Sequence, residues 1–349
     1  MTRKTLVVGF HYHHHDAYSG YGRLMEHLRS AQVYDCTPLF SGRPTTGLDL
    51  AFRRLAVELS TIVKGARADV IHYLYPEGLV FLSPLVLKHV LRKKIVMTLH
   101  LSPASLLQVS REGGAAKAWL RKAFRGLFLR CVRCVDHGIA LTADAAAAYG
   151  HQFGIPRMSV VPHGVVVSRP GAPSKKPLLQ ARPAICVVGR NYRDLAFLNA
   201  VLQDERSRCC EFHLVGVDFD RIRVPEHAQV FCHRERLSHE DYAAVLGRCL
   251  FMLLPLEYAT ANNAVLEAYQ HRLIVLTTAA GMQEEYREPS LVQLDDPKDF
   301  YRAVEGLCAR ARSGDLDVDR LLEAAAASSA RRFGWEGIAR RIEAIHQQV

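Results

Sequence analysis

The chain has 349 residues, of which 49% are hydrophobic and 23% are charged, and its formal net charge at pH 7 is +10. This composition is typical of a soluble globular protein, and the length suits two domains whose cores need no disulfides or metals. It excludes a membrane-spanning chain, because no run approaches the roughly 18 apolar residues that a spanning helix needs.

The basic residues are concentrated in the first half. Residues 1–165 contain 21 Lys and Arg against 10 Asp and Glu. This excess indicates an anionic partner such as phosphate or anionic lipid, although a solvated basic face is the simpler alternative. The nine cysteines form no disulfide or zinc framework, and the first apolar run, at 5–10, is too short for a secretory signal. We therefore expect a cytoplasmic protein.

Short apolar runs alternate with helical patterns along the chain, which predicts parallel sheets covered by helices on both faces. In the first half, the predicted strands lie at 5–10, 69–74, 94–99, 135–141 and 158–161. In the second half, they lie at 184–188, 211–215, 228–231, 250–254, 273–277 and 291–294. The pattern predicts an α/β protein with domains at 1–166 and 183–334, a Pro-, Ser- and Lys-rich linker at 167–182, and a helix at 335–349 that crosses back to the first domain.

The segment PLEYATANNAVLEA, which follows the predicted strand at 250–254, is the strongest functional pattern. Thr260 is a good N-cap, so the next amides are free to bind an anion such as a diphosphate. These amides belong to Ala261, Asn262 and Asn263. Glu267 shares a helix face with Asn263 and is placed to accept the hydroxyls of a ribose. A plain capped helix with a solvated glutamate is the alternative.

This segment resembles the donor-binding signature of retaining GT-B glycosyltransferases of family 4, in a Thr-Ala-Asn-Asn variant. Glu267 matches the second glutamate of that signature. Ala259 stands where the first glutamate is usual, and Glu257 is the nearest carboxylate. The family's following Gly and Pro are replaced by Arg272 and Ile274. The resemblance implies the GT-B fold, with two Rossmann-like doubly wound domains that face a central cleft.

Further segments resemble the family in the same chain order. VVGRNYRD resembles the loop whose basic side chains reach the donor diphosphate, and it supplies Arg190 and Arg193, whose guanidinium groups suit phosphate oxygens. His100 resembles the cleft histidine that contacts the transferred sugar. The glycine-rich acceptor-side loop corresponds to Ser19, Gly20, Tyr21 and Gly22.

The resemblance implies a metal-independent retaining transferase of the hexosyl type, without a cofactor and without a protein nucleophile. Its donor is a nucleotide-diphosphate sugar, and its acceptor is a glycan or a lipid-linked glycan of bacterial surface polysaccharide synthesis. The catalytic set is then His100, Arg190, Arg193 and Glu257. Two alternatives stay open: a degenerate protein that only binds a nucleotide sugar, and a sugar-nucleotide epimerase or hydrolase.

Two other patterns point to partners. Residues 115–135 interleave Lys and Arg with apolar residues at helical spacing, which indicates either a helix packed on the first sheet or a peripheral contact with the anionic inner face of the plasma membrane. Asp218 and Asp220 form an Asp-x-Asp pair, but its position in the chain does not favour a metal site. No nucleic-acid recognition motif is present, and no G-x-G-x-x-G follows the first strand, which disfavours a dinucleotide-dependent dehydrogenase.

Overall fold

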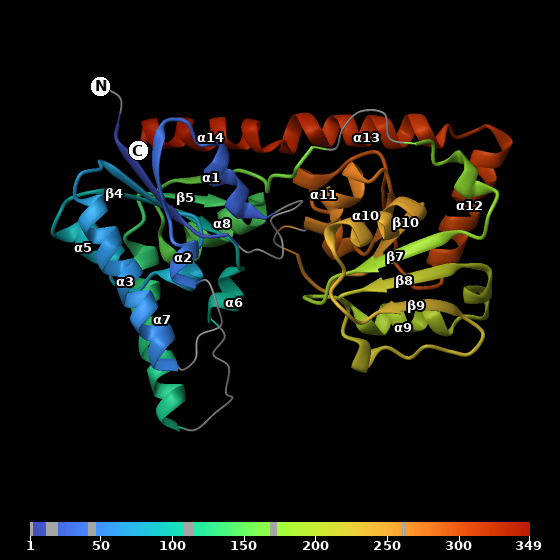
Figure 1. The fold of residues 1–349 in the computed structure, drawn as a ribbon, viewed down its shortest axis with the longest axis horizontal. Coiled ribbons are helices and arrows are strands. Elements are labelled where there is room, and N and C mark those ends of the chain that lie inside the picture. The colour runs from blue at the N-terminus through green and yellow to red at the C-terminus, as the bar shows by residue number, and fades with distance from the viewer. Residues whose placement is uncertain are drawn as a thin grey trace. The chain divides into compact units, whose positions relative to one another are not determined.

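The computed structural model describes residues 3–11, 20–40, 47–107, 115–167, 173–259, 261 and 263–349. The chain divides into two compact units: Met1–Gly164 with Trp335–Val349, and Val165–Gly334. Each unit is built around one six-stranded sheet in which every pair of neighbouring strands is parallel (Figure 1). The predicted α/β fold class, with two Rossmann-like doubly wound domains, is confirmed.

The sheet of the first unit has the order β2-β1-β3-β4-β5-β6. Its strands are β1 Thr5–Gly9, β2 Ala31–Asp35, β3 Val70–Tyr73, β4 Lys94–Leu99, β5 His137–Ala140 and β6 Met158–Val160. Four of them are buried along their whole length or nearly so, since helices cover both faces of a parallel sheet. The sequence did not predict β2, because this edge strand, AQVYD, is only partly buried and lacks a continuous apolar run.

Helices of the first unit pack on the two faces of this sheet. They are α1 Leu24–His27, α2 Thr37–Phe40, α3 Gly47–Gly65, α4 Pro76–Leu79, α5 Ser83–His89, α6 Pro103–Leu107, α7 Ala115–Arg133, α8 Ala143–Phe153 and α14 Trp335–Gln348. Val57 of α3, Leu87 of α5 and Phe128 of α7 share one core with the side chains of β3 and β4. On β3, His72 is buried and contacts His346 of α14, with 2.9 Å between Nδ1 and Nε2. The last helix is therefore part of the first unit.

The sheet of the second unit has the order β12-β11-β10-β7-β8-β9. Its strands are β7 Ala184–Val188, β8 Glu211–Val215, β9 Gln229–His233, β10 Phe251–Leu254, β11 Ile274–Thr277 and β12 Leu291–Gln293. Its α-helices are α9 Leu195–Gln203, α10 His239–Arg248, α11 Asn263–Gln270, α12 Asp299–Ser313 and α13 Val318–Phe333. Among the described residues of the whole chain, no helix is both long and apolar enough to cross a bilayer.

Part of the segment that the sequence predicted as a linker is folded onto the second unit. Lys176–Leu179 form a 3-10 turn, and the side chain of Lys175 is buried. The Lys175 ammonium donates to the carbonyls of Gly247 at 2.7 Å and Cys249 at 2.8 Å, at the end of α10. Burial lowers the pKa of Lys175 to about 8. Residues 173–182 thus close the C-terminus of α10 rather than only joining two domains.

Candidate functional site

In the second unit, the strand order changes direction between β7 and β10, since β8 and β9 are added on one side of β7 and β10 to β12 on the other. Ligands of open parallel sheets bind at the carboxyl ends of the strands at such a point. The segments leaving these two strand ends are bonded to each other: Asp194 N donates to Pro255 O, and Glu257 N donates to Tyr192 O, both at 3.0 Å. The structure therefore brings together the two loops on which the sequence placed the donor contacts.

Arg193 lies in the first of these loops and is only partly exposed. Its Nε donates to Val188 O at 2.8 Å and one terminal nitrogen donates to Asn191 O at 2.9 Å. Within the described residues, no carboxylate forms an ion pair with this guanidinium. Burial lowers its pKa to about 10, so the group is still a cation at neutral pH. A partly desolvated cation held in place by backbone carbonyls favours an anionic ligand.

Gly189 makes this arrangement possible. It follows β7 with φ +83°, a left-handed conformation that a residue with Cβ rarely adopts. A Cβ at this position would lie 2.6 Å from the second terminal nitrogen of Arg193. Any side chain here would therefore strain the backbone and displace the guanidinium.

Arg190 and Glu257, the other two predicted catalytic residues of this unit, are exposed. Arg190 forms an ion pair with Asp218, which follows β8, at 3.3 Å. The Glu257 amide is fixed to the first loop, and its carboxylate lies at the surface. On the same two loops, the rings of Tyr192 and Tyr258 meet edge-on with centroids 5.7 Å apart. Two partly exposed aromatic faces therefore border the loops.

The helix that the sequence predicted to bind the diphosphate is α11, which begins at Asn263. Asn263 and Ala261 are partly exposed next to the end of β10, while Thr260 and Asn262 lie outside the described residues. The segment before α11 is held in place, because the Gln283 side-chain amide donates to Ala259 O at 2.5 Å. The start of α11 thus leaves the same strand end as the loop bonded to Arg193.

Glu267, the predicted ribose ligand, lies one turn further along α11 and is partly buried. Its carboxylate accepts a hydrogen bond from the hydroxyl of Tyr242 on α10 at 2.9 Å. Tyr242 also lies close enough to Arg193 for its phenol to favour the charged guanidinium. The sequence missed this tyrosine, because no local pattern joins α10 to α11. It links Glu267, the predicted ribose ligand, to Arg193, the predicted diphosphate contact.

In the first unit, His100 follows β4 and is held in one orientation. Its Nε2–H donates to Leu74 O at 2.7 Å, so in the neutral ring Nδ1 is the nitrogen with the lone pair. Its amide donates to Glu77 Oε1 at 2.7 Å, and its ring stacks on Tyr75 with centroids 4.8 Å apart. Burial lowers the pKa of His100, against the opposing effect of Glu77. His100 is therefore neutral at pH 7 and presents Nδ1 as a hydrogen-bond acceptor.

Tyr21, from the predicted acceptor-side loop, lies at the centre of an aromatic cluster in the first unit. Its ring meets His100 at 4.7 Å, His163 at 5.2 Å and Trp335 at 5.5 Å, each edge-on. The Trp335 indole nitrogen is buried without a hydrogen-bond partner among the described residues, whereas the Tyr21 hydroxyl has the side chain of Thr98 as its neighbour. An unsatisfied indole donor of this kind is unusual in a folded core.

One glycine of this loop is required by a close contact with His11. A Cβ at Gly22 would lie 2.7 Å from His11 Nδ1, so only glycine permits the close approach of that ring. Gly20 precedes the 3-10 turn Tyr21–Arg23 and is buried. Ser19, the first residue of the predicted loop, lies outside the described residues.

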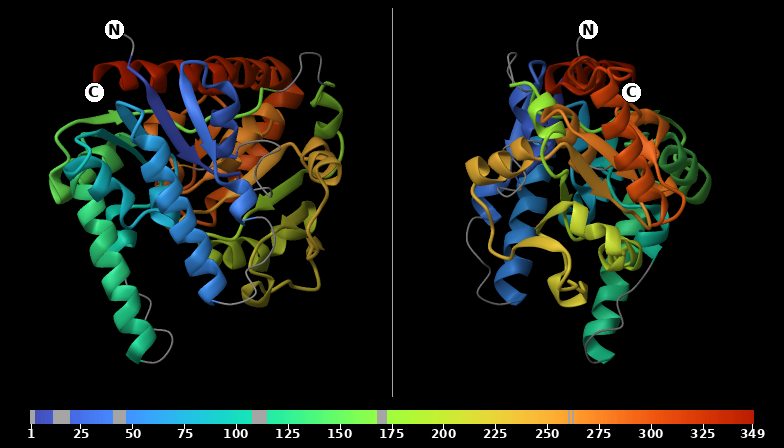
Figure 2. Two further views of the ribbon diagram at one scale, coloured as in Figure 1. Left: turned by 60° about the vertical axis from the view of Figure 1, so that its left-hand side comes forward. Right: turned by 90° about the vertical axis from the view of Figure 1, so that its right-hand side faces the viewer.

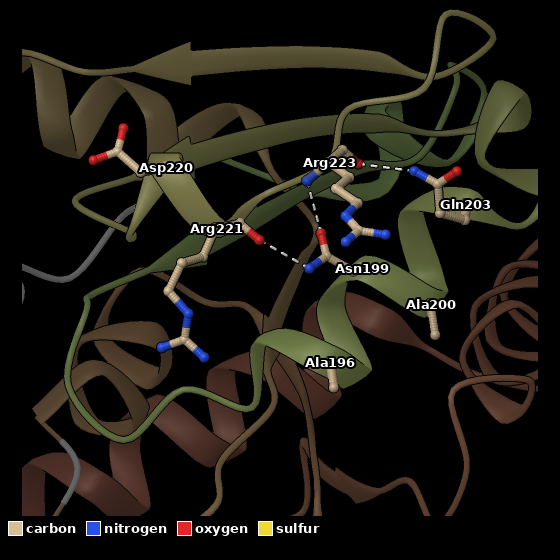
Figure 3. Close-up of a pocket in the computed structure, with 7 residues that line it drawn as sticks. All are labelled: Ala196, Asn199, Ala200, Gln203, Asp220, Arg221 and Arg223. Atoms are coloured by element: carbon tan, nitrogen blue, oxygen red, sulfur yellow. Dashed lines mark hydrogen bonds between the residues drawn. The ribbon is translucent and has the colours of Figure 1, made fainter.

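The second unit also contains a pocket of about 580 Å³ along α9. Figure 3 shows how two α9 side chains bind the backbone of the neighbouring segment: the Asn199 amide donates to Arg221 O at 3.0 Å, and Gln203 donates to Arg223 O at 3.0 Å. Asp220 of the Asp-x-Asp pair lines this pocket, whereas Asp218 pairs with Arg190. In the described part of the chain, no three His, Cys, Asp or Glu residues converge as a metal site would require.

Comparisons with known proteins identify the same two halves. Residues 17–169 match the model of Glycosyltransferase Family 4, and residues 182–310 match that of Glycosyl transferases group 1. No curated protein matches the chain in sequence.

Solved structures of similar fold cover the whole chain at low identity. A sucrose-phosphate synthase from Thermosynechococcus elongatus matches with a TM-score of 0.63 and 14% identity over 99% of both chains. HepE from Anabaena, solved in complex with UDP-glucose, matches with a TM-score of 0.59 and 12% identity over 99% of this chain and 100% of that one. A glycosyltransferase from Rickettsia africae matches with a TM-score of 0.62 and 11% identity over 100% and 99%.

Proposed function

We propose a specific activity for this chain. The two matched models indicate that the chain is a GT-B glycosyltransferase of the family-4 type. It transfers a hexosyl group with retention of configuration from a nucleotide-diphosphate sugar to a glycan or lipid-linked glycan acceptor, without a metal ion. Similar structures contain UDP or UDP-glucose, which supports a nucleotide sugar as the donor. Bacterial surface polysaccharide synthesis is the proposed setting.

The observation that carries the proposal is Arg193. Its guanidinium is bonded to Val188 O and Asn191 O and has no carboxylate ion-pair partner among the described residues, at the strand ends where such sheets bind ligands. An arginine in this position donates to the diphosphate as it leaves the sugar and stabilises the charge that develops there. Arg190, released from Asp218, is the proposed second contact.

The other residues position the donor. The amides of Ala261 and Asn263, just before and at the start of α11, bind the diphosphate, and Thr260 and Asn262 belong to the same predicted segment. Glu267 accepts the ribose hydroxyls while Tyr242 holds its carboxylate. Glu257, at the surface beside Tyr192, is the proposed contact to the sugar. The leaving phosphate itself takes the acceptor proton, so no protein nucleophile is needed.

In the first unit, we assign His100 and the Tyr21 cluster to the sugar and acceptor side. The neutral imidazole of His100 is fixed by Leu74 O, so it presents Nδ1 as a hydrogen-bond acceptor for a sugar hydroxyl. Ser19, Gly20 and Gly22 complete the acceptor-side loop.

The test has two steps. First, thermal-shift measurements with UDP-, GDP-, ADP- and dTDP-sugars identify the donor, since a ligand that binds only the folded state raises the melting temperature by mass action. Second, NMR of the product with that donor reports the configuration of the new bond, in buffer with and without EDTA. An inverted product, a free sugar, an epimerised donor, or loss of turnover in EDTA each contradicts the corresponding part of the proposal.

A further inference from the structure

Helix α3 in the first unit exposes a continuous apolar stripe. Phe52, Leu55, Leu59 and Val63 follow one another at intervals of three or four residues, so they lie on one face of the helix. Their side chains are exposed to 69%, 38%, 51% and 72%. Isolated exposed apolar residues are normal, but four large ones in a row on one helix mark an interaction surface.

The stripe is not a sign of a loosely placed helix, because the opposite face of α3 is firmly packed. Val57 is buried in the core with the strands. The buried Glu58 carboxylate accepts from the amides of Phe81 at 2.5 Å and Leu82 at 3.3 Å, and from the amide of Ser83. These bonds fix the rotation of α3 about its axis, so the apolar stripe is held outward.

The exposed charged residues of α3 itself are basic. Asp49, the other acidic residue of α3, is paired with Arg53 at 2.9 Å. Arg54 and Lys64 are exposed on the same helix. Neighbouring α5 contacts both α3 and α7, and α7 contains no acidic residue. Figure 2 shows α3 and α7 extending side by side away from the sheet. On α7, the residues Lys122, Arg130 and Arg133 are exposed cations.

We propose that this surface of α3 is where the protein binds a membrane that contains anionic lipid. The apolar stripe enters the boundary between headgroups and acyl chains, and the flanking cations bind the headgroup phosphates. A second copy of the chain fits less well, since a two-fold contact through this stripe would place its flanking cations against one another. The inference does not depend on the donor site in the second unit.

This assignment changes the element that carries the membrane contact. The sequence indicated residues 115–135, which include all of α7, as one alternative for this contact. In the described half of that helix, however, Phe128, Cys131 and Val132 are buried in the core. Helix α7 therefore supplies flanking charge, and α3 supplies the apolar side chains that enter the lipid.

The experiment compares full-length protein and variants in sedimentation with vesicles. One set of vesicles is phosphatidylcholine alone, and the other contains added phosphatidylglycerol. Val63→Asp places a carboxylate in the stripe, and Val224→Asp is the matched control at an exposed valine of the second unit. Arg54→Gln and Lys64→Gln test the charges. All four positions are exposed, so the variants fold, and circular dichroism checks that they do.

We expect binding to the anionic vesicles and little binding to phosphatidylcholine. Val63→Asp lowers the partition coefficient for anionic vesicles roughly tenfold or more, since it removes an apolar group from the lipid and adds a charge that the anionic headgroups repel. Each glutamine substitution lowers the same partition coefficient about fivefold. Val224→Asp has no effect.

Three results overturn the inference: no sedimentation with anionic vesicles, equal binding of wild type and Val63→Asp, or equal binding to both kinds of vesicle. Analytical ultracentrifugation adds a fourth. A dimer of the wild-type chain that Val63→Asp dissociates would assign the stripe to a second copy instead.

Discussion

Replacing Arg193 by alanine separates the structural role of this residue from its proposed role at the diphosphate. The side chain donates to Val188 O and Asn191 O within its own loop. The variant therefore loses two hydrogen bonds from a charged donor, each of which contributes roughly 1.5–3 kcal/mol, but it also removes the cost of burying the charge. We take the net loss of unfolding free energy as about 2 kcal/mol, which lowers the melting temperature of a domain of this size by roughly 4–8 °C.

The effect of Arg193→Ala on the rate of sugar transfer is expected to be larger than its effect on stability. A guanidinium that donates to the leaving diphosphate acts like an oxyanion-hole donor, and losing one such donor lowers kcat by roughly 10²–10³-fold, or about 3–4 kcal/mol. Because the apo protein has no anion there, this loss appears in turnover and not in the stability of the free enzyme. Turnover is measured well below the melting temperature of the variant, so that all of the protein is folded.

Arg312→Ala is the matched control. Its Nε also donates to a backbone carbonyl, Leu179 O at 3.0 Å, but it lies on α12, away from the strand ends that carry the loops. It should lower the melting temperature to a smaller extent and leave turnover within about twofold of wild type. Near-wild-type turnover in Arg193→Ala, or an equal fall in both variants, would refute the assignment of Arg193 to the diphosphate.

Three further predictions concern single positions. Gly189→Ala forces a side chain into a left-handed conformation and against the neighbouring guanidinium, so we expect about 1–2 kcal/mol less stability in urea unfolding together with a smaller donor-induced thermal shift. Tyr242→Phe leaves Glu267 without its 2.9 Å hydrogen bond, so KM for the donor should rise several-fold with little change in kcat, and equal kinetics would contradict the coupling. Burial lowers the pKa of His346 to about 4, below the usual 6.5 of an unfolded chain. Its contribution to stability is therefore complete above pH 6.5 and is lost as pH falls toward 4, by about 3 kcal/mol in all. Melting temperatures at pH 7 and pH 5 should differ less in His346→Gln, because the variant lacks this buried imidazole, which gains a proton when the chain unfolds at pH 5.

The sequence predicted the fold and the proximity of the two loops because both follow from local patterns. A buried parallel strand is a short apolar run, and a residue after such a strand lies at its carboxyl end whatever the rest of the chain does. This is why the segments around Arg193 and Glu257 could be paired before the structure placed them in contact. Edge strand β2, which is only partly buried, carried no such signal.

The contacts that hold the site could not be predicted in the same way, since they join residues far apart in the chain. Tyr242 reaches Glu267 from a different helix, and Glu77 fixes the His100 amide across 23 residues. The apolar stripe of α3 was also missed, because the sequence shows that a helix is amphipathic but not which of its faces meets the core. Glu58, an acidic residue on the buried face, illustrates the point: only the amides at 81–83 make its burial possible.

Arg272 shows how far a departure from a family pattern can be judged from residue types alone. The family usually has glycine here, and the resemblance alone left the turn before β11 in doubt. The structure keeps the turn: Arg272 itself adopts the left-handed conformation, with φ +57°, which costs roughly 1–2 kcal/mol in a residue with Cβ. Its guanidinium offsets part of that cost by donating to Pro173 O at 3.1 Å and pairing with Asp319 at 3.5 Å. The glycine of the family supplies a backbone conformation and no chemistry, so an arginine anchored in this way preserves the start of β11. The same reasoning does not extend to Ala259, because the glutamate usual at that position supplies a carboxylate, and in this chain only Glu257 on the same loop is placed to replace it.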